Sequence, residues 1–227
     1  MWQKIQSILT YMYDNYFDEY DFFYLCGDDT HLIVENLWHF LRQAEQVHGS
    51  DGPLFMGARI KPKRVTLNHG GSGYVMNKAA LKKLVEKGLG TKCWPRMRNS
   101  AEDRYIAQCL NRLKISPIHT VDEEGKQKFH GMHPDFYIRT TGMEEDKTDQ
   151  LGGYWASAYR QWGSEYGWRA GVDLISKDTI AFHRVKKEFV MKRHHAMLYK
   201  SCPVGTKLHD AIEKTGLVKQ EAVDDVD

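Results

Sequence analysis

An apolar, aromatic run that ends in two adjacent carboxylates is the feature that most constrains this chain. The run extends from Tyr20 to Cys26 and is followed by Gly27, Asp28 and Asp29. Its length and bulk are typical of a buried strand, and two carboxylates at the end of such a strand are costly unless a positive group meets them. A divalent cation that carries a phosphate is one such group, because Mg²⁺ and Mn²⁺ prefer hard oxygen ligands. The alternative is that Asp28 caps the following turn and Asp29 faces solvent.

Helical and extended patterns alternate along the chain. Gly88 is placed to end one of the helices, and Asn77 and Ser100 are placed as N-caps. The spacing of apolar residues predicts helices over residues 2–16, 78–87, 101–113 and 186–199, and a helical turn that runs into a helix over 31–41. Apolar runs predict strands over 20–26, 54–57 and 180–185, and polar stretches predict loops over 48–53, 68–73, 122–128 and 143–153. This alternation is typical of an α/β fold.

Composition excludes several classes of protein. With 227 residues, of which 41% are hydrophobic and 27% charged, the chain is long and apolar enough for one compact domain. Its formal net charge is +2, so no charge bias points to nucleic acid, and we expect no nucleic-acid partner. The longest apolar run, 22–26, is too short to span a bilayer. We expect one folded domain over residues 1–200 and a polar C-terminal tail over 201–227.

A series of short motifs carries a resemblance. In chain order they are Trp2-Gln3-Lys4, Tyr20-Asp21-Phe22-Phe23, Gly27-Asp28-Asp29-Thr30, Gly70-Gly71-Ser72-Gly73-Tyr74-Val75, Cys93, Ala101-Glu102-Asp103, Cys109-Leu110, Lys128-Phe129-His130, Tyr154-Trp155 and Ile180-Ala181-Phe182-His183. In this order and spacing the chain resembles the β1,3-glycosyltransferases of the fringe and core 1 galactosyltransferase group, and its later half is more similar to the core 1 enzymes.

The resemblance implies a fold and an activity. The fold is a GT-A-type, Rossmann-like domain. The activity is Mn²⁺-dependent, inverting transfer of galactose from UDP-galactose in β1,3 linkage to O-linked GalNAc on a glycoprotein. A fringe- or chondroitin-type transferase that uses another UDP-sugar is the alternative enzyme, and a non-catalytic, chaperone-like relative is the alternative outside catalysis.

The resemblance also implies what precedes such a domain. Members of the group begin with a cytoplasmic tail, one membrane anchor, a stem and the strands that hold the uridine, whereas this chain starts at the helix before the acidic motif. We therefore expect a domain that lacks its N-terminal part. We expect the full-length protein to be anchored in the Golgi membrane with its catalytic domain in the lumen, and a homodimer is one arrangement it could adopt.

The resemblance assigns the metal and donor residues. Asp29 matches the aspartate that binds Mn²⁺, and Asp28 lies beside it on the donor side. The family's motif has three consecutive aspartates, and here the first position is Gly27, which cannot contact the donor. His130 matches the second metal ligand, and His133 and His183 are the alternatives. Without the resemblance, a single histidine in a loop is more often solvated or hydrogen-bonded.

The carboxylate that would act as general base is Asp103, with Glu102 as the second candidate. An inverting transfer needs a base to take the proton of the acceptor hydroxyl. The alternative interpretation of residues 100–103 is a capping box that serves only the helix end.

The remaining candidates lie on the acceptor side or hold the domain together. Gly71 and Gly73 permit close approach of the backbone, and they are expected to shape the acceptor side of the cleft. The aromatic residues Tyr154, Trp155 and Tyr159 are candidates for a sugar-stacking platform, although aromatic residues more often form core. Cys93 and Cys109 match a family disulfide, which would suit an oxidising lumen, and Cys26 is expected to be a buried free thiol.

Overall fold

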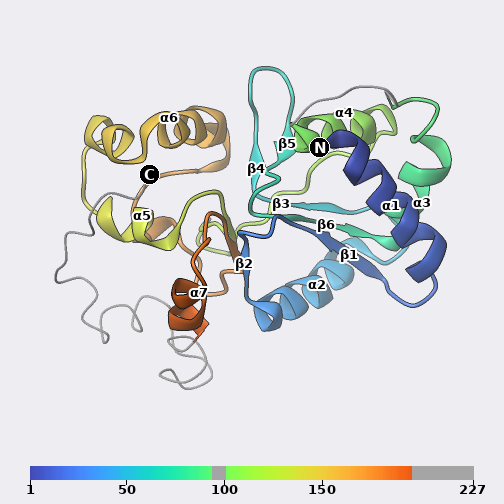
Figure 1. Ribbon diagram of the computed structural model, residues 1–227, viewed down its shortest axis with the longest axis horizontal. Helices are drawn as coiled ribbons and strands as arrows, with labels where there is room; N and C mark the ends of the chain where they lie inside the picture. The colour runs from blue at the N-terminus through green and yellow to red at the C-terminus, as the bar shows by residue number, and fades with distance from the viewer. Residues whose placement is uncertain (94–100, 196–227) are drawn as a thin grey trace. The chain divides into compact units, whose positions relative to one another are not determined.

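The computed structural model describes residues 1–93 and 101–195. By contact clustering, the chain divides into two compact units, Met1–Arg184 and Val185–Asp227. The first contains every candidate site residue and is shown with its elements labelled in Figure 1. In the second, residues 185–195 are described, and they contain the helix α7 (Glu188–His195), where a helix over 186–199 was predicted. The predicted tail, 201–227, lies outside the described residues.

A three-stranded antiparallel sheet carries the acidic pair. Its order is β1 (Phe22–Leu25), β6 (Tyr74–Asn77) and β3 (Phe55–Gly57), with β6 in the middle. Leu25 at the end of β1 pairs with Tyr74 at the start of β6. Because the strands run in opposite directions, this register brings the turn after β1 next to the glycine-rich loop that precedes β6.

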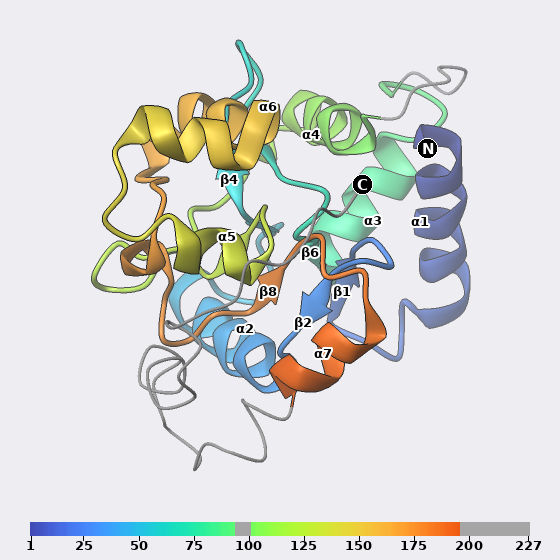
Figure 2. The ribbon, with the colours of Figure 1, turned by 60° about the vertical axis from the view of Figure 1, so that its left-hand side comes forward.

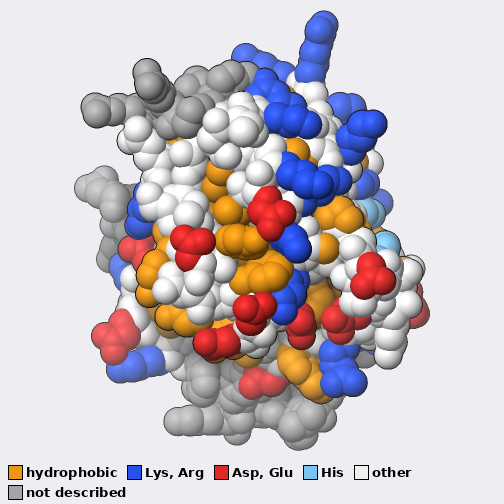
Figure 3. Space-filling view, turned by 90° about the vertical axis from the view of Figure 1, so that its right-hand side faces the viewer, with side chains coloured by type: hydrophobic (Ala, Val, Ile, Leu, Met, Phe, Trp, Pro, Cys, Tyr) orange, Lys and Arg blue, Asp and Glu red, His pale blue; other side chains and the backbone are white. Residues whose placement is uncertain are grey.

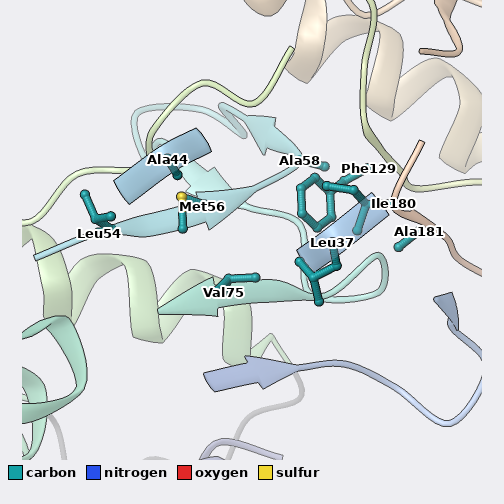
Figure 4. Packing of buried hydrophobic residues seen from close by; sticks show 9 residues of the cluster. All are labelled: Leu37, Ala44, Leu54, Met56, Ala58, Val75, Phe129, Ile180 and Ala181. Atoms are coloured by element: carbon teal, nitrogen blue, oxygen red, sulfur yellow. The ribbon is translucent and has the colours of Figure 1, made fainter. Parts of the chain in front are cut away.

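Helices cover both faces of this sheet. On one face, Leu37 and Ala44 of α2 (Val34–His48) pack with Met56 and Val75 in a core cluster that also includes Phe129 (Figure 4). On the other side lie α1 (Trp2–Tyr16) and α3 (Lys78–Lys87), which contact each other, and α3 also contacts β1 and β6. Both faces of the sheet are therefore buried, which explains the continuous apolar composition of β1.

Two smaller sheets and further helices complete the first unit. In one sheet β8 (Ala181–Phe182) lies between β2 (His31–Leu32) and β7 (Phe129–His130), as Figure 2 shows for β2 and β8. In the other, β4 (Arg59–Ile60) pairs with β5 (Leu67–Asn68). The remaining elements are α4 (Glu102–Arg112), α5 (Pro134–Arg139), α6 (Glu145–Gly163), η1 (Ser164–Tyr166) and η2 (Val172–Leu174).

The α/β class is confirmed, and the mixture of helices and small sheets is consistent with a glycosyltransferase domain. The best local prediction concerns α3: Asn77 is its N-cap and accepts a hydrogen bond from the Ala80 amide at 3.0 Å, and Gly88 is its C-cap. The Asn77 carboxamide also accepts from the Leu54 amide at 2.8 Å, so the same residue fixes the chain before β3.

Three local predictions were wrong. Residues 143–153 were expected to form a loop, but most of them belong to α6, which is kinked at Gly153 with φ of 58°. The segment predicted as a helical turn and helix over 31–41 instead begins with the strand β2 (His31–Leu32), and its helix, α2, continues to His48. Cys26 is exposed, not buried, because the side chains alternate along β1 and its neighbour Leu25 is the one that points inward.

The disulfide between Cys93 and Cys109 is present and closes a loop of 16 residues. A loop of this length stabilises a fold by roughly 3 kcal/mol in the chain-entropy model. The bridge ties α4 to the chain that follows α3. It therefore supports the helix whose first turn carries Glu102 and Asp103.

Exposed aromatic side chains gather on α1 and the turn after it. Tyr11, Tyr16 and Tyr20 are each more than one-third exposed, and successive rings lie about 6 Å apart. Figure 3 shows this side of the molecule, with apolar and charged side chains interspersed. In the described part of the chain, no helix is both long and apolar enough to cross a membrane.

Candidate active site

The glycine-rich loop before β6 is fastened to the acidic turn after β1. The Thr30 hydroxyl donates a hydrogen bond to the Gly71 carbonyl, and the Tyr24 hydroxyl donates to the Ser72 carbonyl, both at 2.7 Å. Gly73 has φ of 77°, and a Cβ there would lie 2.2 Å from the Tyr24 hydroxyl oxygen. Only glycine fits this close approach. The loop and the acidic turn thus form one continuous surface.

Asp29 faces His183 on this surface. The Asp29 Oδ1 and His183 Nε2 atoms are 3.4 Å apart, and the two side chains are 22% and 18% exposed. The other ring nitrogen, Nδ1, is 3.2 Å from the Gly131 carbonyl oxygen. Because a carbonyl oxygen only accepts, Nδ1 must carry the hydrogen, and in the neutral ring the lone pair of Nε2 points toward Asp29. Two acceptors in this arrangement require a cation, either a proton or a metal ion, between or beside them.

Gly71 makes this arrangement possible. A Cβ at Gly71 would lie 2.3 Å from His183 Cε1, so any side chain there would displace the imidazole. A Cβ at Gly27 would lie 2.9 Å from Asp29 Oδ1, so a residue at this first motif position would press on the carboxylate. Asp28, between Gly27 and Asp29, is exposed.

The structure brings His183, and not His130, to the acidic pair. His130 is 1% exposed, its ring stacks on Phe182 at 4.6 Å, and its Nε2 atom is 3.1 Å from the Thr179 hydroxyl. Burial lowers the pKa of His130 to about 3. His133 serves as the N-cap of α5 and accepts a hydrogen bond from the Asp135 amide. Of the three candidate histidines, His183 therefore has the position of a metal ligand.

Glu102 and Asp103 approach the same loop from α4. Asp103 Oδ2 accepts a hydrogen bond from the Gly70 amide at 3.1 Å, and Oδ1 accepts from the Arg104 amide at 2.7 Å. A Cβ at Gly70 would lie 2.3 Å from Glu102 Oε1. The N-cap of α4 is Ala101, which makes no side-chain capping bond. Asp103 thus binds the loop, and the predicted cap at Ser100 lies outside the described residues.

The two carboxylates differ in protonation. Burial raises the pKa of Glu102 to about 7, and the charge of Asp103 adds to the shift. Burial also raises the pKa of Asp103, but the amides of Gly70 and Arg104 oppose it by stabilising the charged form. Glu102 therefore exchanges its proton near pH 7, and the amides of Gly70 and Arg104 favour the charged form of Asp103.

The Glu102→Gln variant should change how stability depends on pH. Because Glu102 ionises at about pH 7 when folded and has an ordinary value of 4.5, the folded state holds more protons between these values, and the wild type loses stability as pH rises through them. The variant lacks this loss. Its free energy of unfolding should rise relative to wild type from pH 4.5 to 7 and then level off.

Urea unfolding at several pH values measures this difference. The exposed Glu123→Gln change is the control for removing one carboxylate elsewhere on the surface, and it should leave the difference small. A Glu102→Gln difference that stays constant with pH would contradict the assigned ionisation of Glu102.

His69, which the sequence showed only as the start of the glycine loop, proves to be a centre of the site. It is 7% exposed, and its Nδ1 atom accepts a hydrogen bond from the Ser72 amide at 3.1 Å. Burial, with the nearby His183 and Arg184, lowers its pKa to about 3. The ring is therefore neutral, with its hydrogen on Nε2, and it donates this hydrogen to the Tyr159 hydroxyl. The loop is thereby joined to α6.

The three aromatic candidates on α6 separate into two kinds. Tyr159 is 3% exposed and bonded to His69, so it supports the loop from within. Tyr154 and Trp155 are 71% and 42% exposed, and their rings contact each other edge to face. The Arg184 guanidinium lies 5.6 Å from the Trp155 ring centroid. Sequence reasoning missed Arg184, although it directly follows His183; no spacing signal marks it.

A metal ion at this site would have two protein ligands. In residues 1–93 and 101–195, no group of three or more His, Cys, Asp or Glu side chains is arranged to hold an ion. Asp29 and His183 supply an oxygen and an imidazole nitrogen, a donor set that suits Mn²⁺. The other coordination positions would be left to phosphate or water.

The site and the fold together define the class of protein to which this chain is similar. Asp29, His183 and the Glu102–Asp103 pair, which the resemblance made candidates for the metal site and the general base, meet at the loop of residues 69–73. No family model matches the chain. It is 27% identical over 188 residues to "Glycoprotein-N-acetylgalactosamine 3-beta-galactosyltransferase 1" of Xenopus laevis. This match confirms the resemblance: the chain is a relative of the core 1 β1,3-galactosyltransferases.

The match covers 82% of this chain and 48% of the Xenopus protein. The chain thus spans about half the length of this curated relative. The alignment supports the class of the domain.

Proposed function

We propose that the protein transfers galactose from UDP-galactose, with inversion and in β1,3 linkage, to O-linked GalNAc on glycoproteins. One observation carries the proposal: the loop of residues 69–73 holds the Asp29–His183 pair on one side and the Glu102–Asp103 pair on the other. A metal–diphosphate site and a general base are thereby adjacent, as transfer from a nucleotide sugar requires. The Xenopus relative's name supports galactose as the sugar and GalNAc as the acceptor.

Asp29 and His183 are the residues that would hold Mn²⁺. The Nδ1–H of His183 is fixed on the Gly131 carbonyl, which directs the lone pair of Nε2 to the Asp29 side. When bound, the ion would supply positive charge to the diphosphate as UDP leaves. Asp28, exposed beside Asp29, is the proposed donor-side residue.

Asp103 is the proposed general base. Its carboxylate would take the proton of the acceptor hydroxyl while that oxygen forms a bond to the anomeric carbon and the bond from this carbon to UDP breaks. The amides of Gly70 and Arg104 orient the carboxylate and keep it charged. Glu102 lies at the same loop and has a pKa of about 7, so it is the second candidate to take the proton of the acceptor hydroxyl.

Tyr154 and Trp155 are the proposed acceptor platform. They are the exposed members of the aromatic group on α6, and aromatic faces pack against the CH-rich faces of sugars. We also propose that the protein acts in the oxidising lumen of the Golgi, which the Cys93–Cys109 bridge supports.

A transfer assay tests the proposal. The chain is incubated with UDP-galactose, Mn²⁺ and a GalNAc-peptide, and the product is digested with a β1,3-specific galactosidase and weighed by mass spectrometry. We expect a mass gain of one hexose that the galactosidase removes. Gain of another sugar when UDP-GlcNAc or UDP-GlcA is supplied would favour the fringe- or chondroitin-type alternative. Binding of Mn²⁺-UDP without any transfer would favour a non-catalytic relative.

A further inference from the structure

A hollow of about 360 Å³ lies away from the candidate active site. It is situated at the β3 edge of the main sheet, where Ile118 forms a parallel bridge with Met56. Phe40 and Val47 of α2 form another wall. None of the residues assigned above to metal, donor, base or acceptor lines it. Its volume falls in the range of small-molecule sites in proteins.

A buried lysine lines this hollow. The Lys128 side chain is 8% exposed, and its ammonium nitrogen is 4.0 Å from Asp178 Oδ2, a carboxylate that is itself 52% exposed. That separation exceeds hydrogen-bond distance. The Phe40 ring centroid is 5.7 Å away. A buried ammonium ordinarily has a close, desolvated anionic partner because removing it from water is costly, and Asp178 satisfies this need only in part.

Three other carboxylates line the hollow, those of Asp122, Glu123 and Glu124, and the charge of Lys128 interacts favourably with Asp122. Asp122 Oδ1 accepts hydrogen bonds from the amides of Glu124 and Lys126 at 3.0 and 2.8 Å, which closes its own turn. Glu124 pairs with Lys126 at 2.8 Å. These contacts hold both acids at the rim. Of the charged side chains that line the hollow, Lys128 is the one that is buried.

We infer that this hollow binds a small organic anion, with its carboxylate or phosphate on Lys128 and an apolar body against Phe40, Met56 and Ile118. Lys128 supplies the charge-assisted hydrogen bonds that select the anion. The acidic rim repels any anion, so contact of an apolar body with the apolar walls is needed for binding. The site is independent of the proposed transferase activity, so either can fail alone.

Nuclear magnetic resonance titration of the full chain tests this inference, with the Met56 methyl group as the reporter because it lines the hollow. The probes are benzoate, phenyl phosphate and the neutral benzyl alcohol. We expect at least one anion to bind about tenfold or more tightly than benzyl alcohol. Whether benzoate or phenyl phosphate is preferred distinguishes a carboxylate from a phosphate ligand.

Substitutions identify the charge responsible. Lys128→Met keeps the length of the side chain and should abolish the preference for anions. The matched control, Lys82→Met, changes an exposed lysine on α3 that does not line the hollow and should keep this preference. Gln43→Trp, at an exposed lining position on α2, should block all three probes without disturbing the core. Equal binding of anions and benzyl alcohol, or an unchanged preference in Lys128→Met, would overturn the inference. If Lys128→Met does not fold, unblocked binding in Gln43→Trp overturns it.

Discussion

Replacing Asp29 by alanine is expected to abolish Mn²⁺-dependent binding of UDP, with a loss of affinity of about a hundredfold or more. Asp29 faces the lone pair of His183. Its removal takes away half of the protein's ligands to the ion and the only charged one. A hundredfold loss corresponds to about 2.7 kcal/mol. Isothermal titration calorimetry with UDP, in the presence and absence of Mn²⁺, measures it.

Asp28→Ala is the matched control, since it removes an adjacent but exposed carboxylate. It should weaken UDP binding less and leave the Mn²⁺ dependence intact. Equal effects of the two substitutions would mean that Asp29 has no special part in metal binding. Mn²⁺-independent UDP binding by the wild type would contradict the metal site altogether.

The same titration decides between the two histidines. His183→Ala should reproduce the loss seen in Asp29→Ala, whereas His130→Ala should act through stability, because His130 is packed on Phe182 and bonded to Thr179 in the core. Thermal unfolding separates the two effects. A folded His130→Ala protein that has lost Mn²⁺-dependent binding would restore His130 as the ligand.

The helices and strands that could be predicted are those that a short stretch of sequence specifies by itself. The helix α1 follows from apolar spacing alone, and α3 follows from its cap and its terminal glycine. The strand β6 was missed because residues 74–77 directly join a glycine loop to a helix cap, so no boundary marks them. The helix α6 was missed because Gly152 and Gly153 interrupt its pattern; Gly152 is there for close packing, since a Cβ would lie 2.5 Å from the Phe136 ring.

The candidate site was also predictable only where a local motif marks its residues. Asp29 and Asp103 each stand in a motif whose local context marks it, and the structure places both at the glycine loop. The partner of Asp29 is determined by strand pairing. The strands β7 and β8 run in parallel, and His130 pairs with Phe182, so that both of these rings lie in the core. The residue after Phe182, His183, then reaches the glycine loop. His69 was missed because its role depends on Tyr159, which is 90 positions away.

Replacing Asp103 by asparagine is expected to lower the turnover number by about 10²–10⁴, the range that a general base contributes. Asparagine cannot accept the acceptor proton, but its carbonyl oxygen can still accept the Gly70 amide hydrogen. The loop should therefore keep its position, and Mn²⁺-dependent UDP binding should remain within about twofold of wild type, because the Asp103 carboxylate is engaged by the amides of Gly70 and Arg104. A combination of initial-rate measurements and UDP titration checks both parts.

Glu102→Gln is the matched variant one residue away. If Asp103 is the base, Glu102→Gln should change the pH dependence of turnover near pH 7, where Glu102 ionises, and lower the rate less than Asp103→Asn. The reverse order would make Glu102 the base, with Asp103 serving to orient the loop through Gly70. If both variants retained full turnover, the proton would have to go to a group outside this pair, and the assignment of α4 to the chemistry would be wrong.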